Sequence, residues 1–303
     1  MASYFRHDFL GRPDGARIYF QVQGFPGTKP GIILCDGLGC DGFAWKYLLP
    51  SLLETHRVVR WHYRGHGESG IPTDHERIGM DQNREDLEAV LDAAGMPSAV
   101  VFGHSMGVQV ALELHRRRPE RVLALALVCG SYGRPLDTFH DTAIFKNALP
   151  YLRGFVDKYP LAIKRLNRVA MSTELAMDLA LSIELNRELM KRGDLIPYFD
   201  HMARMDPAVF LRTLASLADH SALDHLPEVN VPTLVIGGEQ DRFTPAWLSR
   251  RMAQLIPHSE LLMIPGGSHT APLEAPERVW KHVASFLNSL PPGSRMIPGA
   301  PLP

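Results

Sequence analysis

Residues 103–107 read Gly103-His104-Ser105-Met106-Gly107. An apolar run, 99–102, precedes this pentapeptide and a helical pattern, 108–114, follows it, so the sequence predicts a strand, a sharp turn and a helix. Glycine at both ends suits a turn in which the strand and helix backbones crowd together, because glycine has no Cβ. Ser105 would then stand at a helix N-terminus, where free N–H groups and the helix dipole favour negative charge. We interpret the pentapeptide as a nucleophile elbow.

Two later segments supply partners for a nucleophilic serine. The buried-strand pattern 233–236 is followed by a loop that contains Asp241, and the strand pattern 261–264 is followed by a turn that contains His269. A serine is activated when a histidine takes its proton and a carboxylate orients that histidine. The chain order of serine, acid and histidine therefore predicts a triad of Ser105, Asp241 and His269.

With these three motifs in order, residues 4–290 resemble an α/β-hydrolase. The resemblance implies a doubly wound, mostly parallel sheet, and strand patterns alternate with helical patterns along the chain as such a sheet requires. Two alternatives for the acid stay open: Asp137, which follows the preceding strand, and Glu239, which lies just before Asp241.

The resemblance also implies an oxyanion hole made of the backbone N–H groups of Met106 and Leu38. Two residues depart from the family pattern, because Asp36 stands where a histidine is usual and His62 stands where an aspartate is usual. We expect Asp36 and His62 to form a hydrogen-bonded pair, with exchanged polarity, that braces the oxyanion loop. The alternative is that the two side chains are solvated independently.

Composition excludes several other function classes. The formal net charge of the 303 residues is −1, which favours neither nucleic acid nor an anionic membrane as partner, although local patches stay open. No segment approaches the length of a membrane span, no secretory signal begins the chain, and three cysteines do not suggest a disulfide framework. We therefore expect a cytoplasmic protein. No metal-ligand spacing or phosphate-binding loop is present, so we expect no metal and no cofactor.

The pattern of strands breaks after Gly130. Residues 137–220 contain helical patterns, such as 172–191 and 202–218, and no convincing strand, so we expect a helical cap inserted into a core of residues 1–136 and 221–290. Each methionine in this stretch is typical of a residue that fills the core. Together, the methionines favour an adaptable apolar chamber for a substrate. They are Met171, Met177, Met190, Met202 and Met205. The tail 291–303 is rich in proline and glycine and is expected to be flexible.

Taken together, the motifs predict a serine hydrolase that cleaves a carboxylic ester with an apolar acyl or alcohol part through an acyl-enzyme. Ser105 at the elbow argues against epoxide-hydrolase and haloalkane-dehalogenase chemistry, which resembles this pattern but uses a carboxylate nucleophile. Lactone or carbon–carbon bond hydrolysis on the same triad stays open, and so does a small-molecule receptor on the same scaffold. The natural substrate and the oligomeric state are not predicted.

Overall fold

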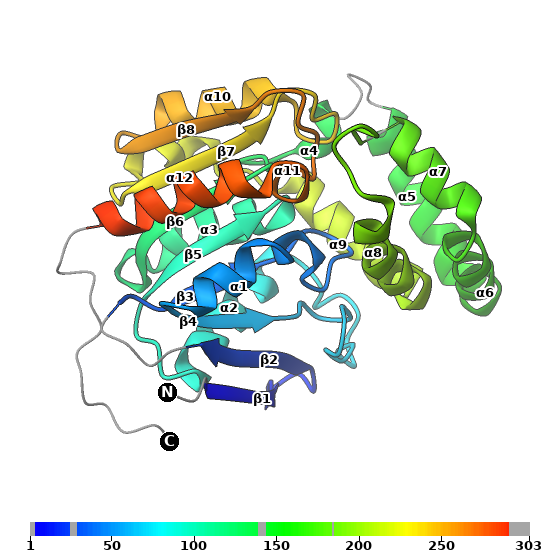
Figure 1. Ribbon diagram of the computed structural model, residues 1–303. Helices are drawn as coiled ribbons and strands as arrows, with labels where there is room; N and C mark the ends of the chain where they lie inside the picture. Colours follow the sequence, from blue (N-terminus) through cyan, green and yellow to red (C-terminus); the bar gives the residue numbers. More distant parts are fainter. Residues whose placement is uncertain (1–3, 25–28, 139–143, 184, 291–303) are drawn as a thin grey trace.

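The computed structural model describes residues 4–24, 29–138, 144–183 and 185–290. In this described part an eight-stranded sheet has the order β1-β2-β4-β3-β5-β6-β7-β8 (Figure 1). The β1–β2 and β2–β4 pairs are antiparallel and all other neighbouring pairs are parallel. The strands are β1 (Tyr4–Gly11), β2 (Arg17–Gly24), β3 (Ile32–Cys35), β4 (Arg57–Trp61), β5 (Ala99–His104), β6 (Val122–Val128), β7 (Thr233–Gly238) and β8 (Ser259–Ile264).

Helices cover both faces of this sheet. Side chains alternate between two apolar clusters, so that Val100 and Phe102 of β5 pack toward α1 and α12 while Val101 packs toward α2 and α3. All positions of β3, β5 and β7 are buried, as expected for central strands of a doubly covered parallel sheet. The covering helices are α1 (Leu48–Leu53), α2 (Met80–Ala93), α3 (Met106–Arg117), α10 (Ala246–Leu255) and α12 (Pro276–Ser289). The predicted doubly wound fold is confirmed.

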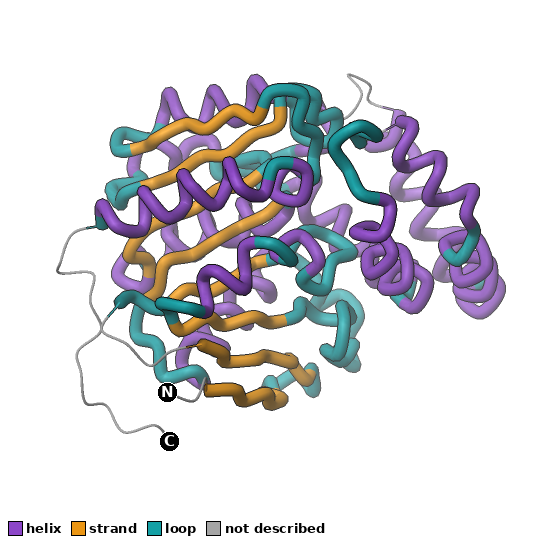
Figure 2. Tube along the Cα trace, in the orientation of Figure 1, coloured by secondary structure: helices purple, strands orange, loops and turns teal. Residues whose placement is uncertain are grey.

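A helical segment, α4–α9, lies between β6 and β7 and gathers beside one end of the sheet (Figures 1 and 2). Its helices are α4 (Pro135–Thr138), α5 (Ile144–Lys158), α6 (Pro160–Met171), α7 (Glu174–Ile183), α8 (Arg192–Arg204) and α9 (Pro207–Asp219). Short helices elsewhere are η1 (Phe43–Trp45), η2 (Pro119–Arg121), η4 (Leu223–Glu228) and α11 (Ala271–Glu274). The described part of residues 137–220 contributes no strand to the sheet, in line with the helical pattern of its sequence.

Two predicted helices are shorter in the structure. The helix expected over 172–191 ends at Ile183, and the Asn186 side chain instead donates to the Gly266 carbonyl and accepts from the Glu188 N–H. The helix expected over 202–218 is interrupted because Pro207 lacks an N–H and Asp206 caps the new helix by accepting from Ala208 N at 2.9 Å.

Strand β1 was not predicted, because its sequence carries Arg6, His7 and Asp8 in place of an apolar run. Pairing with β2 forms this edge strand in spite of its exposed side chains. The cysteines Cys35, Cys40 and Cys129 are free and buried. No helix within the described ranges is long and apolar enough to cross a membrane. The predicted flexible tail 291–303 lies outside the described residues.

Candidate active site

Ser105 lies in the turn between β5 and α3. Its φ of 55° and ψ of −116° are rare for a residue with a side chain, and its N–H donates to the Val128 carbonyl at 3.0 Å. A Cβ on Gly107 would stand 2.1 Å from the Cys35 carbonyl oxygen, and one on Gly103 would stand 2.3 Å from the Gly107 oxygen. Both positions therefore exclude any larger residue, and the close approach of β3, β5 and α3 presents Ser105 at the end of the sheet.

The loops after β5, β7 and β8 bring Ser105, Asp241 and His269 together. The Ser105 Oγ lies 2.9 Å from His269 Nε2, and His269 Nδ1 lies 3.0 Å from Asp241 Oδ2. Because Asp241 is an acceptor, the imidazole Nδ1–H donates to it and Nε2 is left to accept from the serine hydroxyl. These two contacts make a continuous hydrogen-bond chain from carboxylate to hydroxyl.

Asp241 is held by its own loop as well as by His269. Its Oδ1 accepts from the N–H groups of Phe243 and Thr244 at 2.9 and 2.8 Å, and its Oδ2 accepts from the Thr244 hydroxyl at 2.7 Å. The side chain is buried, and these donors keep the carboxylate aimed at the imidazole. Sequence reasoning missed Thr244, although an aspartate three residues before a threonine is a pattern typical of such side-chain turns.

Hydrogen bonds to Glu274 of α11 hold the turn that carries His269. This buried carboxylate accepts from Ser268 N at 2.6 Å, from the Ser268 hydroxyl and from the Thr270 hydroxyl at 2.9 Å. The His269 carbonyl accepts from His104 Nε2 at 3.1 Å. Burial lowers the pKa of His104 to about 3, so His104 is neutral and serves to pack beneath the elbow. Glu274 was not identified from the sequence.

Neither alternative acid contacts His269. Asp137 is exposed on α4, and Glu239 is exposed in the loop after β7. Both hydrogen bonds from His269 Nδ1 to a carboxylate go to Asp241. Among the described residues no group of histidine, cysteine, aspartate or glutamate side chains is arranged to hold a metal ion.

The loop after β3 runs beside Ser105. A Cβ on Gly37 would stand 3.0 Å from the Ser105 Cβ, so the next residue, Leu38, also lies close to the serine. The N–H groups of Leu38 and Met106 have no hydrogen-bond acceptor among the described residues. Met106 begins α3, where such free N–H groups are expected.

The predicted hydrogen bond between Asp36 and His62 is absent. Asp36 Oδ1 accepts from Trp45 Nε1 at 2.6 Å, whereas His62 Nδ1 accepts from the Glu68 N–H at 3.0 Å. Asp36 is buried, so the alternative of a solvated carboxylate is also wrong.

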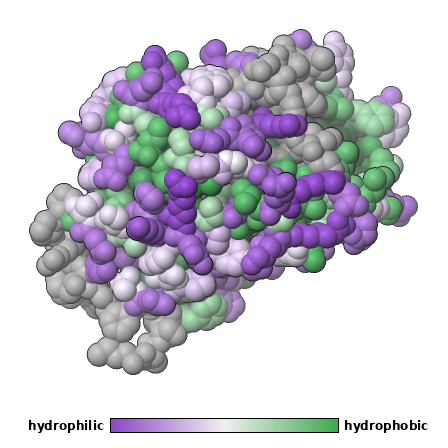
Figure 3. All heavy atoms as spheres, turned by 45° about the horizontal axis from the view of Figure 1, so that its top comes forward, coloured by the Kyte–Doolittle hydropathy of each residue, from purple (hydrophilic) through white to green (hydrophobic). Residues whose placement is uncertain are grey.

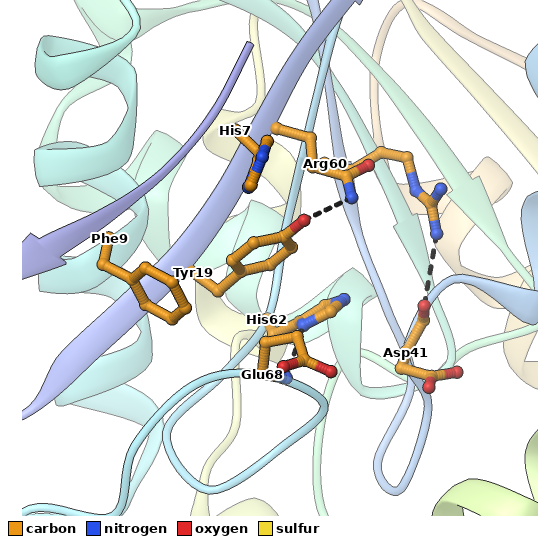
Figure 4. Close-up of a pocket in the computed structure, with 8 residues that line it drawn as sticks. His7, Phe9, Tyr19, Asp41, Arg60, His62 and Glu68 are labelled. Carbon is orange, nitrogen blue, oxygen red and sulfur yellow. Dashed lines mark hydrogen bonds between the residues drawn. The ribbon is translucent and has the colours of Figure 1, made fainter.

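Burial explains why these two residues do not pair as ions. It raises the pKa of Asp36 to about 7 and lowers the pKa of His62 to about 3, and the nearby Arg60 guanidinium lowers both. Arg60 also donates to the Asp41 carbonyl at 3.2 Å, and it lines with His62 an open pocket of about 410 Å³ (Figure 4). His62 thus bonds to the loop at Glu68, whereas Arg60 bonds to Asp41 and is the cation near Asp36.

The raised pKa of Asp36 predicts a pH-dependent stability. Between about pH 4 and pH 7 the folded protein retains a proton that the unfolded chain releases, so this contribution to stability is lost as the pH rises through that range. Asp36→Asn keeps an oxygen acceptor for Trp45 and cannot ionise. Urea unfolding measures the free energy of unfolding of both proteins at each pH. The difference between Asp36→Asn and the native protein should shift by about 1–4 kcal/mol in favour of Asp36→Asn between pH 5 and pH 8. A gap between the two proteins that does not vary with pH, or an equal change in the exposed control Glu277→Gln, would contradict this.

The helical segment α4–α9 contacts the part of the chain that follows β3. Asp194 of α8 pairs with Lys46 at 2.6 Å and accepts from the Tyr47 hydroxyl at 2.9 Å. Met202 of α8 packs so closely on Gly39 that a Cβ there would stand 2.5 Å from the methionine sulfur. An apolar cluster next to this contact contains Ile78, Met202, Met205 and Val209, with Met171, Tyr198 and Phe210 packed against it. Met177 and Met190 lie instead in a separate cluster with Leu181, Leu195 and Phe199.

Comparison with known proteins assigns the family. A match to the alpha/beta hydrolase fold extends over residues 30–276, a range that includes Ser105, Asp241 and His269. This chain belongs to the alpha/beta hydrolase family. The uncharacterized hydrolase YugF of Bacillus subtilis is 25% identical to this alpha/beta hydrolase over 279 residues, which cover 90% of this chain and 95% of that protein.

Solved structures share the fold of this alpha/beta hydrolase. The enol-lactonase from Burkholderia xenovorans LB400 superposes with a TM-score of 0.74 at 21% identity, covering 93% of this chain and 100% of the other. A thermophilic esterase from Thermogutta terrifontis superposes with a TM-score of 0.72 at 23% identity, covering 94% and 99%. At these identities the likeness concerns the fold alone.

Proposed function

We propose that this alpha/beta hydrolase cleaves carboxylic esters that carry an apolar group, with Ser105 as nucleophile, His269 as general base and Asp241 as the acid that orients it. The observation that carries the proposal is the hydrogen-bond chain from Asp241 through His269 to Ser105, with 2.9 Å between the Ser105 Oγ and His269 Nε2. A serine within hydrogen-bond reach of an oriented histidine is the arrangement that acyl transfer requires.

In the proposed reaction the Ser105 Oγ attacks the ester carbonyl carbon while its proton passes to His269 Nε2. Asp241 stabilises the imidazolium through the Nδ1–H. The imidazolium then protonates the departing alcohol oxygen, which leaves an acyl group on Ser105. Water attacks this acyl-enzyme and gives its proton to His269, which passes that proton to the Ser105 Oγ as the bond to the acyl carbon breaks and the carboxylic acid leaves. The reaction balances without a cofactor.

The developing oxyanion would be held by the N–H groups of Leu38 and Met106. Their lack of acceptors among the described residues and their closeness to Ser105 support this role. One donor of this kind typically contributes about 2.7–4 kcal/mol of transition-state stabilisation. Arg60 would support the loop through the Asp41 backbone, since it donates to the Asp41 carbonyl at 3.2 Å.

An apolar substrate is proposed from the surroundings of the oxyanion loop. The cluster of Ile78, Met202, Met205 and Val209 lies against that loop, and methionine adapts its shape to different apolar groups. In this proposal residues 137–220 act as a cap over the site. The three free, buried cysteines are consistent with a reducing, cytoplasmic compartment.

Initial rates on p-nitrophenyl esters from acetate to dodecanoate test this function. We expect turnover with an optimum at one chain length. Met202→Ala should move that optimum toward longer chains by about two to four carbons, because it removes the side chain packed on Gly39. The matched control Met177→Ala makes the same change inside the separate cluster and should leave the optimum in place.

Two results would count against the proposal. If folded protein hydrolyses none of these esters, the ester assignment is wrong, and lactones, carbon–carbon substrates and ligand binding without turnover are to be assayed next. If both methionine variants change the optimum equally, the cluster around Met202 does not form the substrate chamber.

A further inference from the structure

The outer face of α5 and α6 carries many exposed apolar side chains. Exposure is 82% for Tyr151, 74% for Leu161 and 66% for Val169. Hydrophobic surface is visible at this end of the molecule, on the right in Figure 3, interrupted by hydrophilic side chains. We call this surface the outer face; its apolar members are Tyr151, Leu152, Phe155, Tyr159, Leu161, Leu166 and Val169.

These exposed side chains do not take part in the packing of the two helices on the rest of the protein. Helix α5 packs on α9 and α6 packs on α8, and Leu149 and Val156 of α5 point inward and are buried. The exposed residues Tyr151, Phe155 and Tyr159 recur every four positions and face away from the buried side chains of Leu149 and Val156. Apolar side chains that recur in this way on a solvated helix face indicate a surface that meets an apolar phase.

The segment that carries this face is rich in basic residues. Residues 151–171 contain five lysine and arginine residues and one acid, Asp157, in a chain whose formal net charge is −1. Asp157 is itself paired with Arg212 at 3.0 Å. The basic residues are Arg153, Lys158, Lys164, Arg165 and Arg168.

Some of this charge is compensated and some is not. Arg153 lies 3.9 Å from Glu76, and Lys164 lies 3.5 Å from Asp206. Arg165 and Arg168 are exposed and make no ion pair with another described residue. They flank Leu161 and Val169 on α6, so that positive charge and apolar surface alternate on one helix.

We propose that the outer face of α5 and α6 docks on an anionic lipid bilayer. Basic side chains beside exposed leucine, phenylalanine and tyrosine are the combination that binds the interface of an anionic membrane, because the charges reach the headgroups while the apolar groups enter the acyl boundary. A symmetric dimer through this face would bring Arg165 and Arg168 of both copies into one interface, and like charges disfavour such an interface.

Vesicle flotation tests the proposal on the full chain. Vesicles of phosphatidylcholine with about a quarter phosphatidylglycerol should carry the protein to the top of a gradient at low salt, and pure phosphatidylcholine vesicles should not. The double variant Arg165→Glu, Arg168→Glu should bind the anionic vesicles at least about tenfold more weakly. The double variant Leu161→Ser, Val169→Ser should also bind more weakly, because it removes apolar groups that would enter the bilayer.

The matched control is Arg278→Glu, Lys281→Glu, which makes the same charge change on exposed positions of α12 and should bind like the native protein. All these variants should keep native turnover of a soluble ester. The proposal is overturned if the native protein does not float with anionic vesicles, or if the α6 and α12 charge variants float equally.

It is also overturned if sedimentation velocity shows a dimer that the Leu161→Ser, Val169→Ser variant abolishes while vesicles are not bound, since a second copy then covers the face. Flotation does not depend on ester hydrolysis, so failure here is distinguishable from failure of the proposed function.

Discussion

Ser105→Ala is expected to lower kcat on the best p-nitrophenyl ester by about four orders of magnitude or more. The variant removes the Ser105 Oγ, which lies 2.9 Å from His269 Nε2. Because this oxygen is the proposed nucleophile, no acyl-enzyme can form. What activity persists would come from water attack on a substrate that the oxyanion N–H groups still polarise. Steady-state kinetics at saturating substrate measure the loss.

Stability should change little in Ser105→Ala, because the mutation leaves the Ser105 backbone hydrogen bond to Val128 in place. The matched control is Ser249→Ala, since Ser249 is a buried serine of α10 whose hydroxyl has no hydrogen-bond partner among the described residues. It should retain native kcat. Turnover by Ser105→Ala within tenfold of the native rate would rule out Ser105 as nucleophile.

The double variant Ser105→Ala, His269→Ala sharpens this test. If the two residues act as one unit, the second substitution should cost almost nothing once the first is made. Losses that multiply would instead indicate that His269 acts on the substrate independently of Ser105.

Asp241→Asn is expected to lower kcat by about three orders of magnitude. The amide oxygen can keep the backbone donors of Phe243 and Thr244, while the amide nitrogen then faces His269 Nδ1 and favours the tautomer with its proton on Nε2. That tautomer cannot accept from Ser105, and no negative charge is left to stabilise the imidazolium. Steady-state kinetics on the same ester measure the loss, and a change in KM should be small.

Two controls distinguish the alternative acids. Asp137→Asn and Glu239→Gln make the same kind of change on exposed carboxylates that His269 does not contact, and both should retain kcat within about twofold. If Asp137→Asn abolished activity and Asp241→Asn did not, the acid assignment would move to Asp137.

Much of the site follows from local sequence. The apolar run before Gly103 and the helical pattern after Gly107 predict the turn that holds Ser105, because strand and helix periodicity are properties of neighbouring residues. Asp241 and His269 each follow a strand pattern, and parallel strands bring their carboxyl ends to one edge of a sheet. The Ser105 motif could therefore be predicted to converge with two motifs that lie more than a hundred residues later in the chain.

Partners outside these motifs could not be predicted. Asp36 and His62 were expected to pair because each departs from the family pattern, yet Asp36 accepts from Trp45 and His62 accepts from the Glu68 N–H. Burial disfavours the charged form of both side chains and hence an ion pair between them, and each side chain finds its hydrogen-bond partner in another part of the chain. Thr244 and Glu274 were missed for a similar reason, because only the packed loops show which polar side chains support Asp241 and His269.

The sequence by itself determined the alternation of strands and helices, the elbow at Ser105 and the chain order of the three motifs. Only the tertiary structure decided that the Asn186 side chain bonds the Gly266 carbonyl, that β1 forms an edge strand on β2, and which face of α5 and α6 is left exposed. The physical reason is that periodicity and backbone preference act between near neighbours, whereas desolvation and hydrogen-bond partners depend on segments that meet only when the chain folds.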